Sequence, residues 1–258
     1  MFTIATWNVN SLRVRLPQVI EWIEQYTPDV IALQETKTED INFPVSELEA
    51  LGYQVVFSGQ KTFNGVATLS KHAATDPVIA LPDFDNTQKR LLAVTIKGIR
   101  VINVYIPNGG EIPSEKYTYK LAWLKKLISF VQSELKQHSK MIILGDYNIA
   151  PEDRDVCDPV LFEGSVLVSD QVRHIFLQLL KLGFTDAFRA FSEEPGFSWW
   201  DYRQGAFRRN QGLRIDHILF SNALKESFMR CAVDIAPRKH VRPSDHAPVV
   251  ATFSLKGL

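Results

Sequence analysis

The sequence predicts an α/β protein whose β-sheets are mixed rather than purely parallel. Short apolar stretches typical of strands outnumber the stretches with a helical period, and several neighbouring strands are joined by short turns such as Lys97-Gly98. The chain has 258 residues, of which 45% are hydrophobic, so it can bury a large core. We expect residues 1–258 to form one domain, because no linker, repeat or low-complexity tract interrupts them.

Each predicted element rests on its own residue pattern. Apolar residues recur at a helical spacing in three stretches, and these predicted helices span Leu16–Tyr26, Lys116–Leu135 and Val172–Leu182. Apolar runs bounded by turn residues predict the strands, which are Phe2–Asn10, Val30–Leu33, Gly52–Ser58, Gly65–Leu69, Arg90–Ile96, Arg100–Ile106, a strand from Ile142, Leu213–Phe220, Cys231–Ile235 and Val249–Leu255. Pro151–Ser169 has no clear period and contains Asp and Pro, so we expect a loop there.

The stretch Ile142–Pro151, which reads IILGDYNIAP, is the most informative in the chain. Its apolar run ends abruptly at Gly145, as expected for a buried strand. In extended chain the side chains of Asp146 and Asn148 point the same way. A simple turn is the alternative interpretation, because Asp, Asn and Gly all favour turns. The stretch alone does not decide between a turn and a functional site.

The same arrangement recurs at other strand ends. Polar side chains follow apolar strands at Asn8, Glu35 and Tyr105, and Asp245 and His246 come just before the last strand. Ligands of α/β sheets bind at the carboxyl ends of the strands. We therefore expect these segments to deliver their polar groups to one shared site.

The residue types in this set indicate chemistry on a phosphate ester. Carboxylate and amide oxygens suit Mg²⁺ or Mn²⁺, and the sequence has no Cys/His set typical of zinc, no P-loop and no nucleophile elbow. A metal and hydrogen-bond donors would stabilise charge on the phosphate, and a carboxylate would take a proton from water. Asp216 lies in the middle of a predicted strand, where an unpaired carboxylate is costly, so we expect it to pair with His246. A surface loop position for His246 is the alternative.

Charge and composition narrow the partners and the compartment. Lys+Arg and Asp+Glu both number 29, yet basic residues gather before two of the acids: Arg208, Arg209 and Arg214 precede Asp216, and Arg238–Arg242 precede Asp245. This predicts contact with a phosphate backbone, with an ordinary solvated basic loop as the alternative. The two cysteines fit a reduced, cytoplasmic protein, and no apolar run is long enough to cross a membrane.

Eight segments in order, TWNVNSLR, LQETK, NGVA, VINVYIPNG, LGDYNIAP, FSWWDYR, GLRIDHIL and PSDHAPV, resemble the exonuclease III family of apurinic/apyrimidinic endonucleases over nearly the whole chain. The resemblance implies a four-layer αββα sandwich with two mixed sheets face to face. It also implies Mg²⁺-dependent cleavage of double-stranded DNA, with Mn²⁺ as a substitute metal. The implied activities are incision at abasic sites, removal of blocked 3′ ends and 3′→5′ exonuclease activity, carried out by a monomer.

The resemblance also implies roles for individual residues. Glu35 would be the principal metal ligand, with Asn8 nearby and Asp245 assisting. Asp146 would act as base or acid and, with Asn148, as ligand to a second metal. Asn148 would also steady the transition state, Tyr105 would lie by the phosphate, and Asp216 would orient His246 against it. The DNA-binding set comprises Arg90, Asn108, Trp200, Arg208, Arg209, Arg214 and His246.

The aromatic segment Phe197–Arg203 predicts how an abasic sugar is recognised. Because Trp200 adjoins Asp201, we expect it at a polar rim where its indole packs on the sugar, while Phe197 and Trp199 belong to the core. Two features depart from the family pattern: His217, where many relatives carry an apolar or aromatic residue, and the variable loop Asp155–Asp170 beside the lesion pocket. The alternatives are a phosphatase acting on an inositol or phospholipid head group and an inert DNA-binding relative.

Overall fold

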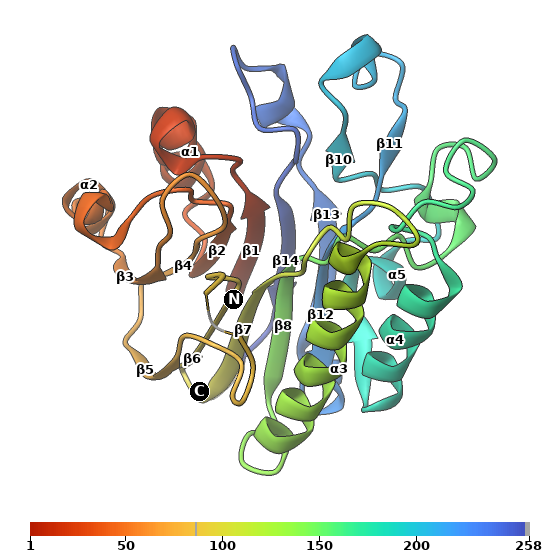
Figure 1. The fold of residues 1–258 in the computed structure, drawn as a ribbon. Coiled ribbons are helices and arrows are strands. Elements are labelled where there is room, and N and C mark those ends of the chain that lie inside the picture. The colour runs from red at the N-terminus through yellow and green to blue at the C-terminus, as the bar shows by residue number, and fades with distance from the viewer. Residues whose placement is uncertain (86, 256–258) are drawn as a thin grey trace.

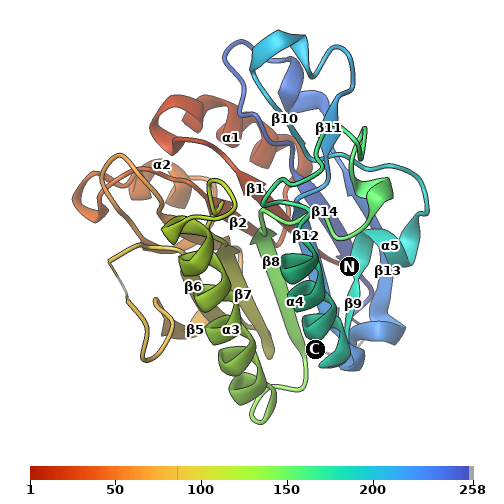
Figure 2. The same cartoon turned by 45° about the vertical axis from the view of Figure 1, so that its right-hand side comes forward.

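The computed structural model describes residues 1–85 and 87–255, and its centre is a pair of six-stranded sheets packed face to face with helices outside (Figure 1). Helices α1 (Leu12–Tyr26) and α2 (Val45–Glu49) lie against one sheet, and α3 (Glu115–Leu135) and α4 (Asp170–Lys181) lie against the other (Figure 2). The predicted four-layer sandwich is therefore confirmed.

The first sheet has the strand order β13-β14-β1-β2-β4-β3. Its strands are β1 (Phe2–Asn8), β2 (Val30–Gln34), β3 (Gln54–Ser58), β4 (Val66–Ser70), β13 (Phe228–Val233) and β14 (Val249–Phe253). Within it, β1 and β2 run parallel and the other described pairs are antiparallel. The sheet is mixed, as predicted.

The second sheet has the order β5-β6-β7-β8-β12-β9. Its strands are β5 (Ala74–Val78), β6 (Leu91–Ile96), β7 (Ile99–Tyr105), β8 (Met141–Asp146), β9 (Phe184–Asp186) and β12 (Asp216–Ser221). Here β7 and β8 run parallel. The two sheets thus each have a parallel pair, β1–β2 and β7–β8, which carry most of the polar strand ends.

Alternation along the strands produces separate apolar layers. On β8, Ile142 and Leu144 face the other sheet, whereas Ile143 faces α3 and α4. On β1, Ile4 likewise faces inward and Ala5 packs towards α1. Both faces of these strands are buried, which explains why they appear in the sequence as continuous apolar runs rather than as alternating ones.

Smaller elements surround the sandwich. Helix α5 (Ala187–Phe191) follows β9, and a two-stranded ribbon is formed by β10 (Trp199–Trp200) and β11 (Gly212–Leu213). Short 3₁₀ turns lie at Asp40–Asn42, Asp153–Asp155, Arg203–Gly205, Asn222–Ser227 and Ala236–Lys239. In the described residues, no helix combines the length and apolar character of a membrane span.

The structure corrects one predicted strand. Leu213–Phe220 is not continuous, because β11 ends at Leu213 and β12 begins only at Asp216. Asp216 therefore opens its strand instead of lying in the middle. Arg214, in the break between the two, belongs to a buried ionic cluster. The break lets the chain leave the small ribbon and enter the second sheet.

Candidate active site

The polar side chains at the ends of β1, β2, β7 and β8 lie at the same edge of the two sheets and contact one another between the sheets. Asn8 is paired with Gln34 at the end of β1 and β2, and Tyr105 is paired with Asp146 at the end of β7 and β8. The Asn8 amide donates to Glu35 Oε1 and to Asp146 Oδ2, both at 2.9 Å. Asn8 thus bridges two carboxylates at the ends of strands of different sheets, so the structure brings these three residues together.

The turn after β8 orients Asn148 back towards Asp146. The Asn148 backbone N–H donates to Asp146 Oδ1 at 2.9 Å, and its side-chain amide donates to Ile106 O at 3.0 Å and to Asp146 Oδ2 at 3.3 Å. A side chain at Gly145 would place a Cβ 1.9 Å from Val104 O, so this strand end requires glycine. The Gly-Asp-x-Asn pattern therefore combines close strand packing with a buried carboxylate–amide pair.

Asp216 and His246 form the predicted pair. His246 Nδ1 lies 2.8 Å from Asp216 Oδ2, and because a carboxylate accepts, this ring nitrogen donates. Ser198 also donates to Asp216 Oδ2, at 2.6 Å, which fixes the carboxylate. The other ring nitrogen, Nε2, faces Asp146 Oδ2 at 3.8 Å. Asp216 thus sets the ring orientation that presents Nε2 to the centre of the site.

The segment that carries His246 is tied to β1 and to the β10–β11 ribbon. Ser244 Oγ donates to Asn8 O at 2.6 Å, and Trp7 Nε1 donates to His246 O at 3.2 Å. The backbone N–H of Trp200 donates to Asp245 O at 3.0 Å. The segment Ser244–His246 is therefore held from both the first sheet and the β10–β11 ribbon.

The carboxylates of the site differ in their affinity for protons. Burial alone would raise the pKa of Glu35, but Lys37, 2.8 Å away, and the Asn8 amide hold that pKa below its ordinary value. Burial raises the pKa of Asp146 to about 7, although the charge of His246 acts the other way. Burial opposes the charge of His246, but Asp216 and Asp146 raise its pKa to about 10. The neighbouring carboxylates therefore favour the charged form of His246, which can donate from Nε2 towards the centre of the site.

The same carboxylates fit a divalent cation. One ligand atom each from Glu35, Asp146 and His246 lies within 4.8 Å of the others. Buried carboxylates facing one another repel unless a cation lies between them, and hard oxygen donors suit Mg²⁺ and Mn²⁺. The donor set at Glu35 and Asp146 is therefore consistent with the predicted metal site.

The remaining predicted metal ligands make other contacts. Asn8 and Asn148 present amide nitrogen, not oxygen, to the carboxylates, so in this structure both are hydrogen-bond donors. Asp245 accepts from Asn10 and from Trp199 Nε1, each at 2.9 Å, and it does not belong to the group of Glu35, Asp146 and His246. Its carboxylate holds the rim of the site together.

Tyr105 and Arg90 lie together at the side of the site. The Arg90 guanidinium stacks 4.4 Å from the centre of the Tyr105 ring and donates to Tyr105 O at 3.2 Å. Burial, and then the nearby Glu35, raise the pKa of Tyr105, so its hydroxyl stays protonated and can donate. Arg90 also lines a surface pocket that includes Asn108, which donates to Asn148 Oδ1 at 3.1 Å.

The expectation for Trp200 is wrong. Its side chain is only 2% exposed and packs edge-on against Phe207, with Arg238 on another side. Trp199, which we placed in the core, does pack against a core cluster, but it is partly exposed and its indole N–H reaches Asp245. Trp199 and Trp200 point to opposite faces of the β10–β11 ribbon, as predicted, but Trp199 and not Trp200 is on the face that contacts Asp245. The rim aromatic is therefore Trp199.

Arg214 is also misplaced by the sequence interpretation. It is 1% exposed and is paired with Asp155 and Asp186, so it cannot reach DNA. Arg238 is buried too, against aromatic rings. The basic residues before Asp216 therefore differ in burial: Arg214 is buried, whereas Arg208 and Arg209 are exposed. A DNA contact of Arg208 and Arg209 stays a prediction.

Sequence reasoning missed three residues that organise the site. Asn10 accepts from Lys37 Nζ at 2.6 Å and donates to Asp245, and Ser198 holds Asp216. Lys120 is buried on α3 and donates to Asn148 O at 2.6 Å. Of these, only Lys120 has a usable signal, since it occupies the apolar stripe of its helix together with Tyr117 and Leu124.

Hydrolysis of a phosphate ester needs a cation on the phosphate oxygens, an acceptor for the proton of water and hydrogen-bond donors. Glu35, Asp146 and His246 can supply these together, so the fold and the site define the class of metal-dependent phosphoesterases. The family comparison agrees: the profile of the endonuclease/exonuclease/phosphatase family matches residues 5–246, and the chain belongs to that family.

Within the family, the chain is similar to exodeoxyribonuclease III and to apurinic/apyrimidinic endonucleases. It is 36% identical to exodeoxyribonuclease III of Haemophilus influenzae, over 96% of this chain and 98% of that protein. Two solved structures superpose with a TM-score of 0.96. One is the 3′ phosphatase NExo (D146N) from Neisseria bound to a product DNA hairpin, which is 44% identical and covers 98% of this chain and 99% of the other. The second is an AP endonuclease from Archaeoglobus fulgidus, 41% identical, with 99% and 100% covered.

Proposed function

We propose that this chain is a Mg²⁺-dependent DNA-repair nuclease that hydrolyses phosphodiesters in duplex DNA. The activities proposed are incision at abasic sites, 3′→5′ exonuclease activity and removal of phosphate or blocked groups from 3′ ends. The observation that carries the proposal is the bridge from Asn8 to Glu35 and Asp146, which sets two carboxylates from different sheets beside the Asp216–His246 pair. The relatives named exodeoxyribonuclease III and 3′ phosphatase support DNA as the substrate.

The residues divide the work of hydrolysis between them. Mg²⁺ or Mn²⁺ held by Glu35 and Asp146 would supply positive charge to the phosphate oxygens. The His246 ring and the Tyr105 hydroxyl would donate to the same oxygens. Asp146 would take a proton from the attacking water, and Asn148 would keep its carboxylate in place.

The DNA surface that we propose surrounds this centre. Arg90 and Asn108 lie on one side of it. Trp199 takes the role first given to Trp200, with its partly exposed indole beside Asp245 packing against an abasic sugar or an unstacked 3′ end. The exposed Arg208 and Arg209 would hold the phosphate backbone. We further propose a monomer working on such DNA in the bacterial cytoplasm.

A cleavage assay in Mg²⁺ tests the proposal. The substrates are a duplex with an abasic site, a hairpin with a 3′-phosphate, an intact duplex and an inositol phosphate, each with and without EDTA. We expect metal-dependent cleavage of the damaged DNA substrates and none of the inositol phosphate. Asp146→Asn keeps the side-chain shape but should lower turnover by about two to four orders of magnitude. Preferred hydrolysis of the inositol phosphate, or DNA binding without cleavage, would refute it.

A further inference from the structure

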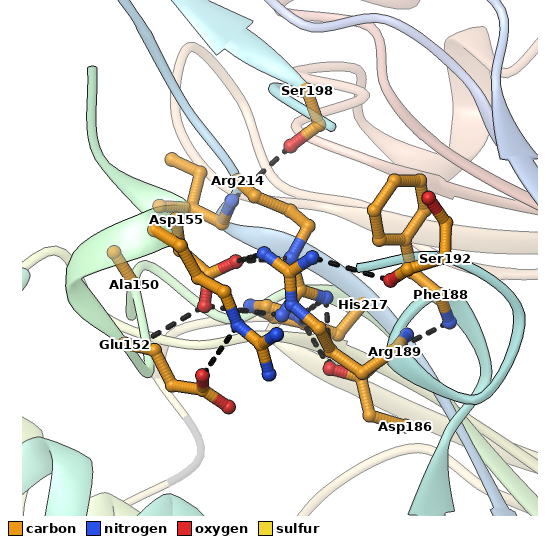
Figure 3. Close-up of polar contacts among 12 residues, drawn as sticks. Ala150, Glu152, Asp155, Asp186, Phe188, Arg189, Ser192, Ser198, Arg214 and His217 are labelled. Atoms are coloured by element: carbon orange, nitrogen blue, oxygen red, sulfur yellow. Dashed lines mark hydrogen bonds and ion pairs between the residues drawn. The ribbon is translucent and has the colours of Figure 1, made fainter. Parts of the chain in front are cut away.

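A buried ionic cluster of Asp155, Asp186, Arg189 and Arg214 lies beside His217, the second residue of β12 (Figure 3). Arg214 Nε is 2.6 Å from Asp155 Oδ1, and its Nη1 is 2.8 Å from Asp186 Oδ2. Arg189 also pairs with Asp155. The cluster contains equal numbers of Arg and Asp, so it is neutral without any further cation.

His217 joins this cluster through Arg214. Its Nδ1 lies 3.0 Å from Arg214 Nη1. An arginine only donates, so Nδ1 must be the unprotonated nitrogen and the ring proton must be on Nε2. That nitrogen lies 2.9 Å from Ile149 O, to which it donates. Burial, and then the Arg214 charge, lower the pKa of His217 to about 4, in agreement with a neutral ring.

The acceptor Ile149 directly follows Asn148 in the turn after β8. Each successive carbonyl there accepts from a different side chain: Asn148 O from Lys120 Nζ at 2.6 Å, Ile149 O from His217, and Ala150 O from Arg173 Nε at 3.1 Å. Asn148 itself has φ of 50°, the left-handed conformation, which costs conformational energy. The turn that aims Asn148 at Asp146 is therefore held in place by contacts from outside the site.

We propose that His217 is a positioning residue: fixed in its Nε2–H form by Arg214, it holds the Ile149 carbonyl and so keeps Asn148 aimed at Asp146. The inference rests on the proposed nuclease function. His217 touches neither the substrate nor the metal position, since it is buried between the rings of Tyr147 and Phe176. Loss of its hydrogen bond would free the turn, and small displacements at a reacting centre have large effects on rate.

Two substitutions at this position separate positioning from packing. His217→Leu fills the space between the rings but leaves Ile149 O without its donor, whereas His217→Gln keeps an amide donor of similar reach. Release of phosphate from a 3′-phosphate hairpin is measured for each variant, with KM and kcat separated, well below the unfolding temperature. His174→Leu, an exposed histidine change on α4, is the matched control.

We expect His217→Leu to lower kcat by about ten- to a hundred-fold with KM little changed, because the DNA surface is untouched. His217→Gln should restore most of the rate. Nitrogen NMR of histidine-labelled protein should show that His217 is protonated on Nε2. This measurement does not depend on enzyme activity.

Unchanged kcat in His217→Leu, equal losses in the Leu and Gln variants, or a proton on Nδ1 would overturn the inference. Failure of the wild-type chain to cleave would instead count against the proposed function, while the NMR result would still report the hydrogen bond.

Discussion

Arg214→Met distinguishes a structural arginine from a DNA-binding one. The sequence pattern placed Arg214 on DNA, whereas the structure buries it between Asp155 and Asp186 with 1% of its surface exposed. The substitution keeps an apolar stem of similar length but leaves both carboxylates without their main cation. Breaking a buried pair on one side costs about 3–5 kcal/mol.

This loss is measurable by urea unfolding. For a chain of this size, with a slope of about 3 kcal/mol per molar urea, the midpoint should fall by more than about 1 M. Arg214→Lys keeps the positive charge but loses the forked hydrogen-bonding geometry, so its urea midpoint should fall less than that of Arg214→Met. The lysine variant therefore provides a folded protein if Arg214→Met does not fold. The exposed Arg208→Met is the matched control and should unfold at the wild-type midpoint.

DNA binding supplies the second measurement on the same proteins. The slope of log affinity against log salt should be unchanged in the Arg214 variants, because this side chain contacts no phosphate. In Arg208→Met the slope should become shallower by about one. A wild-type urea midpoint together with a shallower salt slope in Arg214→Met would refute the structural assignment.

Three further predictions concern the site and its support. If Asp216 acts only through His246, the double variant Asp216→Asn/His246→Asn should be little slower than the poorer single variant, and additive losses in a double-mutant cycle would show independent roles. Because burial lowers the pKa of His217 from 6.5 to about 4, the unfolded chain binds a proton in that window that the folded chain does not. The stability of the wild-type chain relative to His217→Leu should therefore fall by about 3 kcal/mol as pH drops from 6.5 to 4, and parallel pH curves for the two proteins would contradict this. Trp199→Ala should reduce abasic incision more than 3′-phosphate release, whereas Trp200→Ala should cost about 3–5 kcal/mol of stability and leave that ratio of activities unchanged; the reverse result would restore Trp200 to the rim.

Local patterns were enough to predict the strand ends and what they carry. Asn8, Glu35 and Asp146 each follow an apolar run, and the rule that ligands bind at strand ends brings them together without knowledge of the fold. The Asp216–His246 pair was predicted because an unpaired carboxylate beside apolar residues is costly. These predictions depend on neighbours in sequence and on the chemistry of single side chains.

The failures depend on contacts between distant segments. Whether Trp199 or Trp200 faces the site is set by the pairing of β10 with β11 and by Arg238, none of which a local pattern reveals. Arg214 looks like part of a basic run until Asp155 and Asp186, far away in sequence, are seen to surround it. Burial of a charged residue depends on its partners, and partners are long-range.

The most direct test of the proposed metal site is the Mg²⁺ dependence of 3′-phosphate release by the wild-type chain and by Glu35→Gln. The amide keeps the hydrogen-bonding shape beside Asn8 but removes the charge that would hold the cation. We predict a wild-type fold and at least about a tenfold higher half-saturating Mg²⁺ concentration for the variant, since loss of one buried charge contact is worth more than about 1.4 kcal/mol. An unchanged Mg²⁺ requirement in Glu35→Gln would contradict the assignment of the site.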